Sequence, residues 1–261
     1  MKKWTTSKIR KCKGVEPIPC TTAYDAAFAR LFDEAGIPLL LVGDSVGNNV
    51  LGFSSTVPVT MEMMLHHTAA VTRGVENSFV VGDMPFMSYQ VSDERAIINA
   101  GRFIQEAGAD AVKFEGGKLR AGLVHKMVEN GIPVVGHVGL TPQSVLAMGG
   151  YRMQGKRPED AKKVLDDAKA IEEAGAFAIV LECIPDDLAK TITETLSIPT
   201  IGIGAGPHCD GQILVMHDFL GINPSTPSFV KRFAELGDAV RKSASAYADE
   251  VRAGTFPPSR A

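Results

Sequence analysis

The chain contains little cysteine, little tryptophan and little net charge. Its 261 residues include four cysteines and one tryptophan, and the formal net charge at pH 7 is −3. The cysteines have neither C-x-x-C spacing nor clustering, which argues against a zinc site and is typical of reduced thiols in the cytoplasm. Near-neutral charge gives no basic surface for nucleic acid or an anionic membrane. We therefore expect a cytoplasmic protein without a nucleic-acid partner.

Long apolar runs and internal linkers are also missing. No apolar stretch approaches the ~20 residues of a membrane-spanning helix, so we expect no membrane partner. The basic N-terminus lacks the apolar core of a secretory signal. No composition shift divides the chain, and about 250 residues suit one α/β barrel. We expect a single domain over residues 1–261, with a short N-terminal covering segment and a C-terminal helical region that ends in a loose tail.

What the chain does contain is a recurring pattern of short, mainly apolar runs, each followed by an ionisable residue. A strand buried on both faces of a parallel sheet has such a continuous run. In α/β enzymes, reactive groups lie at the carboxyl ends of these strands. The runs are residues 39–43 before Asp44, 79–82 before Asp83, 111–114 before Glu115, 133–136 before His137, and 178–181 before Glu182.

The segments between these runs predict helices that end at glycine. Residues 34–36, 106–108, 129–131 and 173–175 each place a glycine just before an apolar run. Glycine tolerates the left-handed backbone that ends many helices. With a first strand near 17–22, a seventh over 199–206 and an eighth over 213–218, the pattern predicts an α/β fold, a single-domain (β/α)8 TIM barrel. A doubly wound open sheet is the alternative.

Two aspartates follow neighbouring predicted strands, the second and third. Neighbouring strands lie about 4.8 Å apart, so Asp44 and Asp83 can converge on one ion. Hard oxygen ligands suit Mg²⁺, and Glu115 could add a third carboxylate or hold a metal-bound water. Helix capping by Asp44 and Asp83 is the competing interpretation.

Lysine, histidine and glutamate complete the set of candidate residues. Lys113 and Glu115 lie two apart on one strand and share a face, so Lys113 could neutralise a substrate carboxylate, form a Schiff base or form an internal salt bridge. His137 could bind substrate, shuttle a proton or serve a structural role. Glu182 beside apolar side chains suits a general base, with a buried salt bridge as the alternative.

Taken together, these stretches resemble the ketopantoate hydroxymethyltransferase family over nearly the whole chain. Four of the matching motifs are LVGDS (41–45), DMPFM (83–87), VKFEGG (112–117) and GHVGLTPQS (136–144), and further matches lie at 22–25, 58–60, 67–71, 149–151, 181–183, 201–206 and 210–215. The resemblance implies a (β/α)8 barrel that assembles as a homodecamer of two stacked pentamers.

The resemblance also implies a reaction and a role for each candidate residue. The reaction is the Mg²⁺-dependent transfer of a hydroxymethyl group from 5,10-methylenetetrahydrofolate to 3-methyl-2-oxobutanoate, in pantothenate biosynthesis. Small-molecule keto acid and folate are the implied partners. The metal ligands would be Asp44 and Asp83, with Glu115 beside the ion. Glu182 would accept the proton as the catalytic base, and substrate would be bound by Asp44, Ser45, Asp83, Lys113 and His137.

Three other functions remain open on the sequence. A Mg²⁺-dependent C–C lyase of the phosphoenolpyruvate mutase/isocitrate lyase type would use similar carboxylates without folate. A class I aldolase would use Lys113 as a Schiff base. A non-catalytic scaffold would keep the barrel alone. Dependence on folate, borohydride trapping and metal-dependent deuterium exchange separate these functions.

Overall fold

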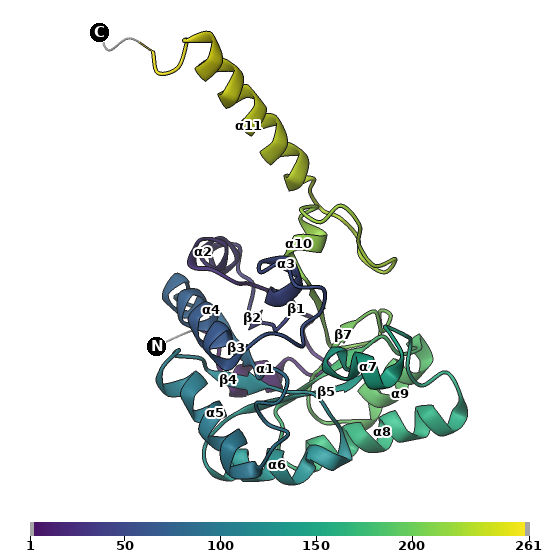
Figure 1. Ribbon diagram of the computed structural model, residues 1–261. Coiled ribbons are helices and arrows are strands. Elements are labelled where there is room, and N and C mark those ends of the chain that lie inside the picture. Colours follow the sequence, from purple (N-terminus) through teal and green to yellow (C-terminus); the bar gives the residue numbers. More distant parts are fainter. Residues whose placement is uncertain (1–2, 259–261) are drawn as a thin grey trace. The chain divides into compact units, whose positions relative to one another are not determined.

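The computed structural model describes residues 3–258, in which eight parallel strands form a closed barrel in chain order. Figure 1 shows the strands enclosed by helices. The strands are β1 (Ile18–Thr22), β2 (Leu39–Val42), β3 (Phe79–Asp83), β4 (Ala111–Lys113), β5 (Val134–Gly139), β6 (Ala178–Glu182), β7 (Thr200–Ile203) and β8 (Gly211–Leu214). The prediction of a (β/α)8 barrel is confirmed, and the open sheet is excluded.

Helices separate successive strands from β1 to β7 as the sequence pattern predicts, and a loop over residues 204–210 takes the place of a helix between β7 and β8. They are α1 (Thr6–Lys11), α2 (Ala26–Glu34), α3 (Val46–Asn49), α4 (Met61–Gly74), α5 (Asp93–Gln105), α6 (Lys118–Glu129), α7 (Val145–Met148), α8 (Pro158–Glu173), α9 (Asp186–Thr195), α10 (Met216–Phe219) and α11 (Leu236–Ala253). A 3-10 turn, η1 (Pro142–Ser144), follows β5.

The helix boundaries follow from local side-chain chemistry. The side chains of Asp25, Thr60 and Ser92 accept hydrogen bonds from backbone N–H groups in the first turns of α2, α4 and α5. Such caps satisfy donors that the helix itself leaves unpaired. The four predicted glycine stops all have a left-handed backbone, at Gly36, Gly108, Gly131 and Gly175. These helix ends are therefore set by residues that act within a few positions of themselves.

The eighth strand begins earlier than predicted. It starts at Gly211 and ends at Leu214, and residues 216–219 form α10 instead of its continuation. Gly211 is required at this point because a Cβ there would meet the carbonyl oxygen of Ile18 at the start of β1. The close approach of β1 thus places the strand start at a glycine, which interrupts the apolar pattern used to predict the strand.

The barrel interior is filled by apolar side chains at the amino-terminal ends of the strands. Leu39, Phe79, Val135 and Ile201 belong to one buried cluster. Ile9 of α1 is fully buried in the same cluster, so α1 covers this end of the barrel. The opposite end, where the strands finish, carries the polar side chains described below.

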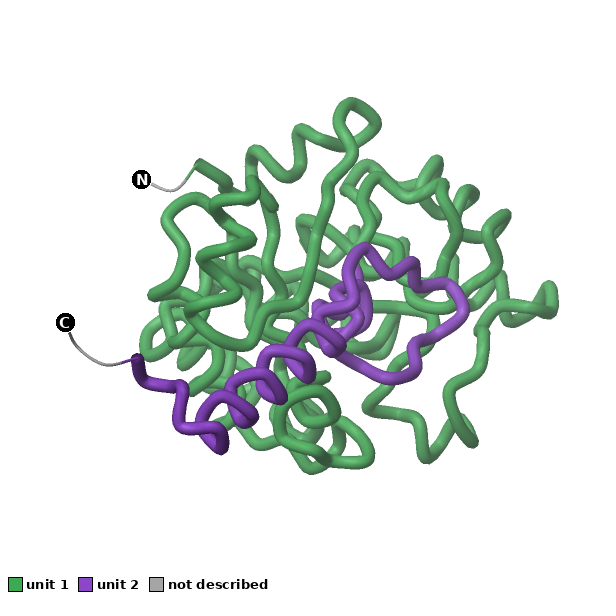
Figure 2. Tube along the Cα trace, turned by 90° about the horizontal axis from the view of Figure 1, so that it is seen from above, with its two compact units in different colours: residues 1–213 green, residues 214–261 purple. Residues whose placement is uncertain are grey.

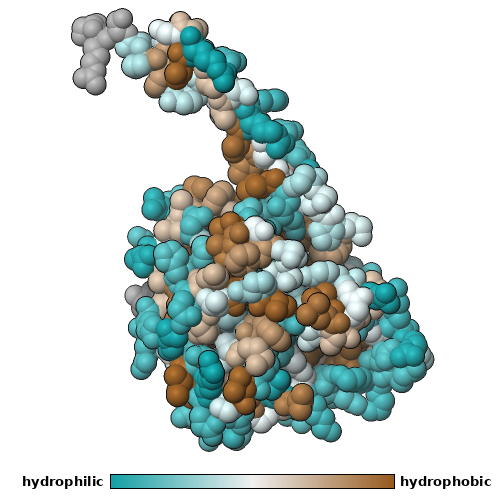
Figure 3. Space-filling view, viewed as in Figure 1, coloured by the Kyte–Doolittle hydropathy of each residue, from teal (hydrophilic) through white to brown (hydrophobic). Residues whose placement is uncertain are grey.

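The chain divides into two compact units, residues 1–213 and residues 214–261 (Figure 2). The expectation of a single domain over the whole chain therefore stays a prediction. The C-terminal helical region is α11, and part of the predicted tail, residues 259–261, lies outside the described residues. Figure 3 shows hydrophilic residues interspersed with apolar ones on the surface. Within residues 3–258, no helix combines the length and apolarity needed to cross a membrane.

Candidate active site

Five of the predicted site residues converge at the carboxyl end of the barrel, and all five are buried. Asp44, Asp83, Lys113, Glu115 and His137 each expose 5% or less of their surface. They lie at the ends of β2, β3 and β4 or, for His137, within β5. Ionisable groups are rarely buried to this extent unless they pair with one another or bind a ligand. Their shared burial marks this end of the barrel as the candidate active site.

The two aspartates are in contact through the backbone of Asp44, and Asp83 also pairs with a lysine. Asp83 Oδ2 accepts a hydrogen bond from the Asp44 backbone N–H at 3.2 Å. Asp83 Oδ1 lies 2.8 Å from Lys113 Nζ, and the two residues are paired across β3 and β4. The internal salt bridge considered for Lys113 therefore forms with Asp83 rather than with Glu115.

Burial and mutual repulsion shift the ionisation of this group. Burial, reinforced by the charge of Asp83, raises the pKa of Asp44 well above its usual range. Burial also raises the pKa of Glu115, with Asp44 and Asp83 adding to the effect. Burial alone would lower the pKa of Lys113, but Asp83, Glu115 and Asp44 outweigh it and raise that pKa. Lys113 is thus held as an ammonium ion, which disfavours the Schiff-base chemistry of a class I aldolase.

His137 connects Lys113 to Glu182. Its Nδ1 lies 3.2 Å from Lys113 Nζ, and its Nε2 lies 3.1 Å from Glu182 Oε2. Burial, followed by the charge of Lys113, lowers the pKa of His137, so its ring is neutral. Because an ammonium only donates, Nδ1 must accept and the ring proton sits on Nε2, facing Glu182.

Glu182 is more accessible than the other acids. Its side chain is 17% exposed, against 4% for Glu115 and for Asp83. It stands at the end of β6, where Gly139 of β5 is its pairing partner. Its position beside a neutral imidazole and near solvent suits proton transfer to and from a bound substrate.

Ser45 is held by a residue that the sequence analysis did not select. Its Oγ lies 2.9 Å from the hydroxyl of Tyr24, which is 1% exposed. The backbone carbonyl of Tyr24 in turn lies 2.7 Å from His67 Nδ1, which gives that histidine a structural role. The tyrosine follows β1 in a polar turn, and a search for ionisable residues at strand ends passes over it.

Gln143 and Tyr89 are two further residues that the sequence analysis missed as individuals. The Gln143 side-chain amide donates to Asp44 Oδ2 at 2.9 Å, and its backbone N–H donates to Glu115 Oε2 at 3.1 Å. The Tyr89 hydroxyl donates to Gln143 Oε1 at 2.7 Å. Both residues lie in loops beyond strand ends, so no periodic pattern selects them. The available signal for Gln143 was its place in the matching motif GHVGLTPQS, and Tyr89 lies in none of the matching motifs.

The donor atoms of this site fit a hard divalent cation. Carboxylate oxygens predominate, and they are the protein ligands that Mg²⁺ prefers. Among residues 3–258, Asp83 Oδ1 is buried without an aligned hydrogen-bond partner. Three buried carboxylates lie near one ammonium, so in their ionised form they carry more negative charge than that ammonium neutralises. No group of three or more His, Cys, Asp or Glu side chains in the described chain is arranged to hold a metal by itself. Asp44 and Asp83 therefore fit as a ligand pair, with Glu115 oriented toward Gln143.

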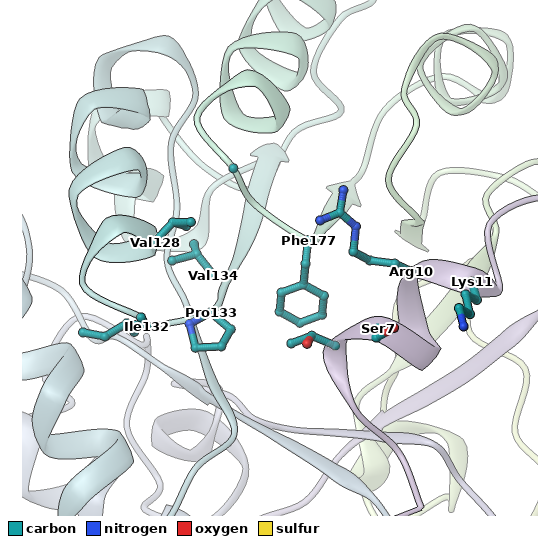
Figure 4. A pocket seen from close by; sticks show the side chains of 11 residues that line it. Ser7, Arg10, Lys11, Val128, Ile132, Pro133, Val134 and Phe177 are labelled. Carbon is teal, nitrogen blue, oxygen red and sulfur yellow. The ribbon is translucent and has the colours of Figure 1, made fainter.

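A separate cavity of about 600 Å³ lies at the other end of the barrel (Figure 4). It is bounded by Arg10 of α1 and by Pro133, Val134 and Phe177 near the starts of β5 and β6. In barrels of this kind, the amino-terminal ends of the strands contribute to stability, and catalytic residues lie at the carboxyl ends. This cavity is therefore not assigned to the site.

Sequence comparison assigns the chain to a family of similar proteins. The family model described as ketopantoate hydroxymethyltransferase matches residues 3–259. A 3-methyl-2-oxobutanoate hydroxymethyltransferase of Syntrophus aciditrophicus is 59% identical over 98% of this chain and 95% of its own length. The same enzyme of Carboxydothermus hydrogenoformans is 56% identical over 98% of this chain and 94% of its own.

Solved structures share the fold at much lower sequence identity. A phosphonopyruvate hydrolase in complex with oxalate and Mg²⁺ has a TM-score of 0.66 and 14% identity, covering 98% of this chain and 89% of its own. A 2,3-dimethylmalate lyase of the PEP mutase/isocitrate lyase superfamily has a TM-score of 0.62 and 16% identity, covering 98% and 91%. At this level of identity, the similarity shows a shared barrel fold and nothing about function.

Proposed function

The chain belongs to the ketopantoate hydroxymethyltransferase family and is a hydroxymethyltransferase, and we propose that it uses Mg²⁺ and 5,10-methylenetetrahydrofolate to convert 3-methyl-2-oxobutanoate into ketopantoate for pantothenate biosynthesis. The observation that carries this proposal is the buried Asp44–Asp83 pair opposite the half-buried Glu182, with Lys113 and His137 between them.

Asp44 and Asp83 would hold the cation, and Glu115 would lie beside it. When bound, Mg²⁺ supplies Lewis-acid polarisation of the keto acid's carbonyl, which acidifies the hydrogen on C3. The Lys113 ammonium lies against Asp83 and would neutralise charge on the substrate carboxylate. Ser45, fixed by Tyr24, would donate its hydroxyl proton to a substrate oxygen.

Glu182 would remove the C3 proton. The ring proton of His137 faces Glu182 Oε2 and holds the carboxylate as a proton acceptor. Charge that develops on the substrate as the C–H bond breaks lies near a fixed ammonium, so little reorganisation of solvent is needed. C3 then forms a bond to the one-carbon unit of the folate, and both C–N bonds that hold this carbon to the folate break. Water supplies the hydroxyl group of the product, and the two folate nitrogens take up the remaining proton of that water and the proton removed from C3.

The test of the base is hydrogen exchange at C3. Replacing Glu182→Gln removes the proton acceptor and keeps the side-chain volume, so C3 deuterium exchange in D₂O should stop while keto-acid binding remains. Glu173→Gln, at an exposed position at the end of α8, is the matched control. This variant should catalyse C3 exchange at the wild-type rate. NMR spectroscopy of the keto acid measures the rate of C3 exchange with each variant. Undiminished exchange in the Glu182 variant would refute the assignment.

Folate dependence separates the proposed transferase from a lyase. The solved barrels with this fold include lyases and hydrolases, but their identity to this chain is 16% or lower among those described above. The transferase should consume 3-methyl-2-oxobutanoate only when methylenetetrahydrofolate and a divalent ion are both present. Cleavage of a C–C bond without folate would favour the lyase.

We also propose a homodecamer and a cytoplasmic location for the enzyme, on the strength of the family resemblance. Ten copies of a 27.8 kDa chain would elute far from a monomer. Light scattering coupled to gel filtration measures the mass directly. A monomeric or dimeric species that retains full turnover would contradict the assembly.

A further inference from the structure

The side chain of Gln143 makes four hydrogen bonds at the carboxyl end of the barrel. It lies in η1 and is 4% exposed. Its Nε2 donates to Asp44 Oδ2 and to the carbonyl oxygen of Met84, each at 2.9 Å. Its Oε1 accepts from the Tyr89 hydroxyl at 2.7 Å and from Gln90 Nε2 at 3.3 Å. The amide thus uses both of its donors and both acceptor positions, which is the full capacity of the group.

The direction of each hydrogen bond is fixed by its neighbours. A backbone carbonyl can only accept, so the nitrogen of the Gln143 amide must face Met84 and therefore also Asp44. The oxygen must then face Tyr89, whose hydroxyl donates to it. The phenol oxygen is left to accept from the backbone N–H of Glu115, at 3.3 Å.

These bonds close into a ring that includes one predicted metal-site residue, Glu115, and a further bond joins the ring to a second, Asp44. The Glu115 N–H donates to Tyr89, Tyr89 donates to Gln143, and the Gln143 backbone N–H donates to Glu115 Oε2 at 3.1 Å. The side-chain amide of Gln143 also donates a hydrogen bond to Asp44. One residue on the loop after β5 thus holds carboxylates carried by the ends of β2 and β4.

We propose that Gln143, supported by Tyr89, is a positioning residue that orients the Asp44 and Glu115 carboxylates and thereby sets the affinity of the site for a divalent cation. This inference rests on the proposed function. One oxygen of each carboxylate is bound to Gln143, which restricts rotation of the group and keeps the other oxygen available to the cation. Partners of this kind, which bind ligand side chains rather than the metal, are worth about 10- to 100-fold in metal affinity.

The first test measures binding of Mn²⁺ alone to the whole protein. Mn²⁺ is a spectroscopic substitute for Mg²⁺ at oxygen sites, and the free ion is read by electron paramagnetic resonance. Gln143→Met keeps the volume without the amide, and Tyr89→Phe removes only the hydroxyl. Each should weaken Mn²⁺ binding about tenfold. The double variant should be little weaker than Gln143→Met, because residues that act as one unit are not additive.

Matched controls make the same chemical changes elsewhere. Gln105→Met changes an exposed glutamine at the end of α5, and Tyr247→Phe changes an exposed tyrosine in α11. Both should bind Mn²⁺ like wild type. In turnover, the site variants should need about tenfold more Mg²⁺ for half-maximal rate, with kcat at saturating Mg²⁺ nearly unchanged.

The possible outcomes separate positioning from mere structural support. Circular dichroism at the assay temperature confirms that each variant is folded. Folded variants that bind Mn²⁺ as tightly as wild type would overturn the inference and leave the proposed function standing. A lower kcat at saturating Mg²⁺ with unchanged Mn²⁺ affinity would also overturn it. A wild-type protein that turns over without binding Mn²⁺ or Mg²⁺ would overturn the metal assignment together with this inference.

Discussion

At the scale of single residues, the site is organised by an imbalance of buried charge. Asp44, Asp83 and Glu115 are carboxylates, and Lys113 is the one ammonium among the five buried site residues. The positions of the three carboxylates were predictable because each follows an apolar run that contains a strand. Gln143 and Tyr89, which form hydrogen bonds with these residues, were not predictable, because neutral loop residues carry no periodic or charge signal. The identity of the salt-bridge partner was also out of reach, since it depends on the register of β3 against β4.

Lys113→Met should lower the free energy of unfolding, because it removes the positive charge that lies among these buried carboxylates. Without the ammonium, Asp83 loses its buried partner, and breaking such a pair costs about 3–5 kcal/mol. Added Mg²⁺ should recover part of the loss, because the cation supplies positive charge at the same carboxylates. Thermal unfolding with and without Mg²⁺ measures the difference, and Lys118→Met at an exposed position is the control. A loss that Mg²⁺ leaves unchanged would contradict the shared site.

At the scale of elements, each βα junction depends on two kinds of residue. Caps and glycine stops act within a few positions, and for that reason the glycine stops could be predicted from the sequence. Carboxylates that bind distant backbone were not predictable, because their partners lie far along the chain. Asp33 near the end of α2 accepts from the backbone N–H groups of residues 76–78, before β3. Glu172 in α8 binds the N–H groups of Ser197 and Ile198, before β7. These contacts fix where the strands enter the barrel.

Gly139 is a junction residue that pairs directly with the proposed base, Glu182. Its φ is +95°, and a Cβ at this position would overlap the backbone carbonyl of Glu182. Gly139→Ala should therefore displace β6 at the proposed base and lower kcat by about 100-fold, the effect of misplacing a reacting group by ~1 Å. Steady-state kinetics measures kcat.

The control for this prediction is another glycine without spatial constraint. Gly101 lies within α5, and a Cβ there would meet nothing within 4 Å. Gly101→Ala should retain wild-type kcat and gain about 0.5–1 kcal/mol of stability, because alanine favours the helix. Equal kcat in both alanine variants would show that the β5–β6 contact does not position Glu182.

At the scale of the whole barrel, closure joins the first strand to the last. The backbone N–H of Ile18 donates to the carbonyl oxygen of Asp210 at 2.9 Å, next to the start of β8. Eight strands could be counted from the apolar runs, so the fold class was predictable. The register where β1 meets β8 was not predictable, because Gly211 and Gln212 begin β8 without an apolar signal. We call this junction of the first and last strands the seam. Closure is a contact between chain positions nearly 200 residues apart, which no local pattern specifies.

The Asp210 side chain ties the same seam together, and its charge should make stability depend on pH. It accepts from Lys13 Nζ at 2.9 Å, the Gly14 N–H at 3.1 Å and the Thr200 N–H at 2.8 Å. Burial alone would raise the pKa of Asp210, but these hydrogen bonds outweigh it and lower that pKa. A depressed folded-state pKa contributes stability above the unfolded value of about 3.9 and loses it as pH falls through the folded value.

Asp210→Asn should therefore lower the free energy of unfolding at pH 7 by about 1–3 kcal/mol, the usual effect of losing a charged hydrogen-bond partner. The deficit relative to wild type should narrow as pH falls below about 4, because Asp210 is then protonated first in the unfolded chain and, at its lower folded-state pKa, in the native protein. Urea unfolding across this range measures both effects. Asp249→Asn, whose side chain is 75% exposed beside Arg252, is the control and should show little change at either pH. A deficit that stays constant from pH 7 to acid would mean that the seam depends on the shape of the Asp210 side chain rather than on its charge.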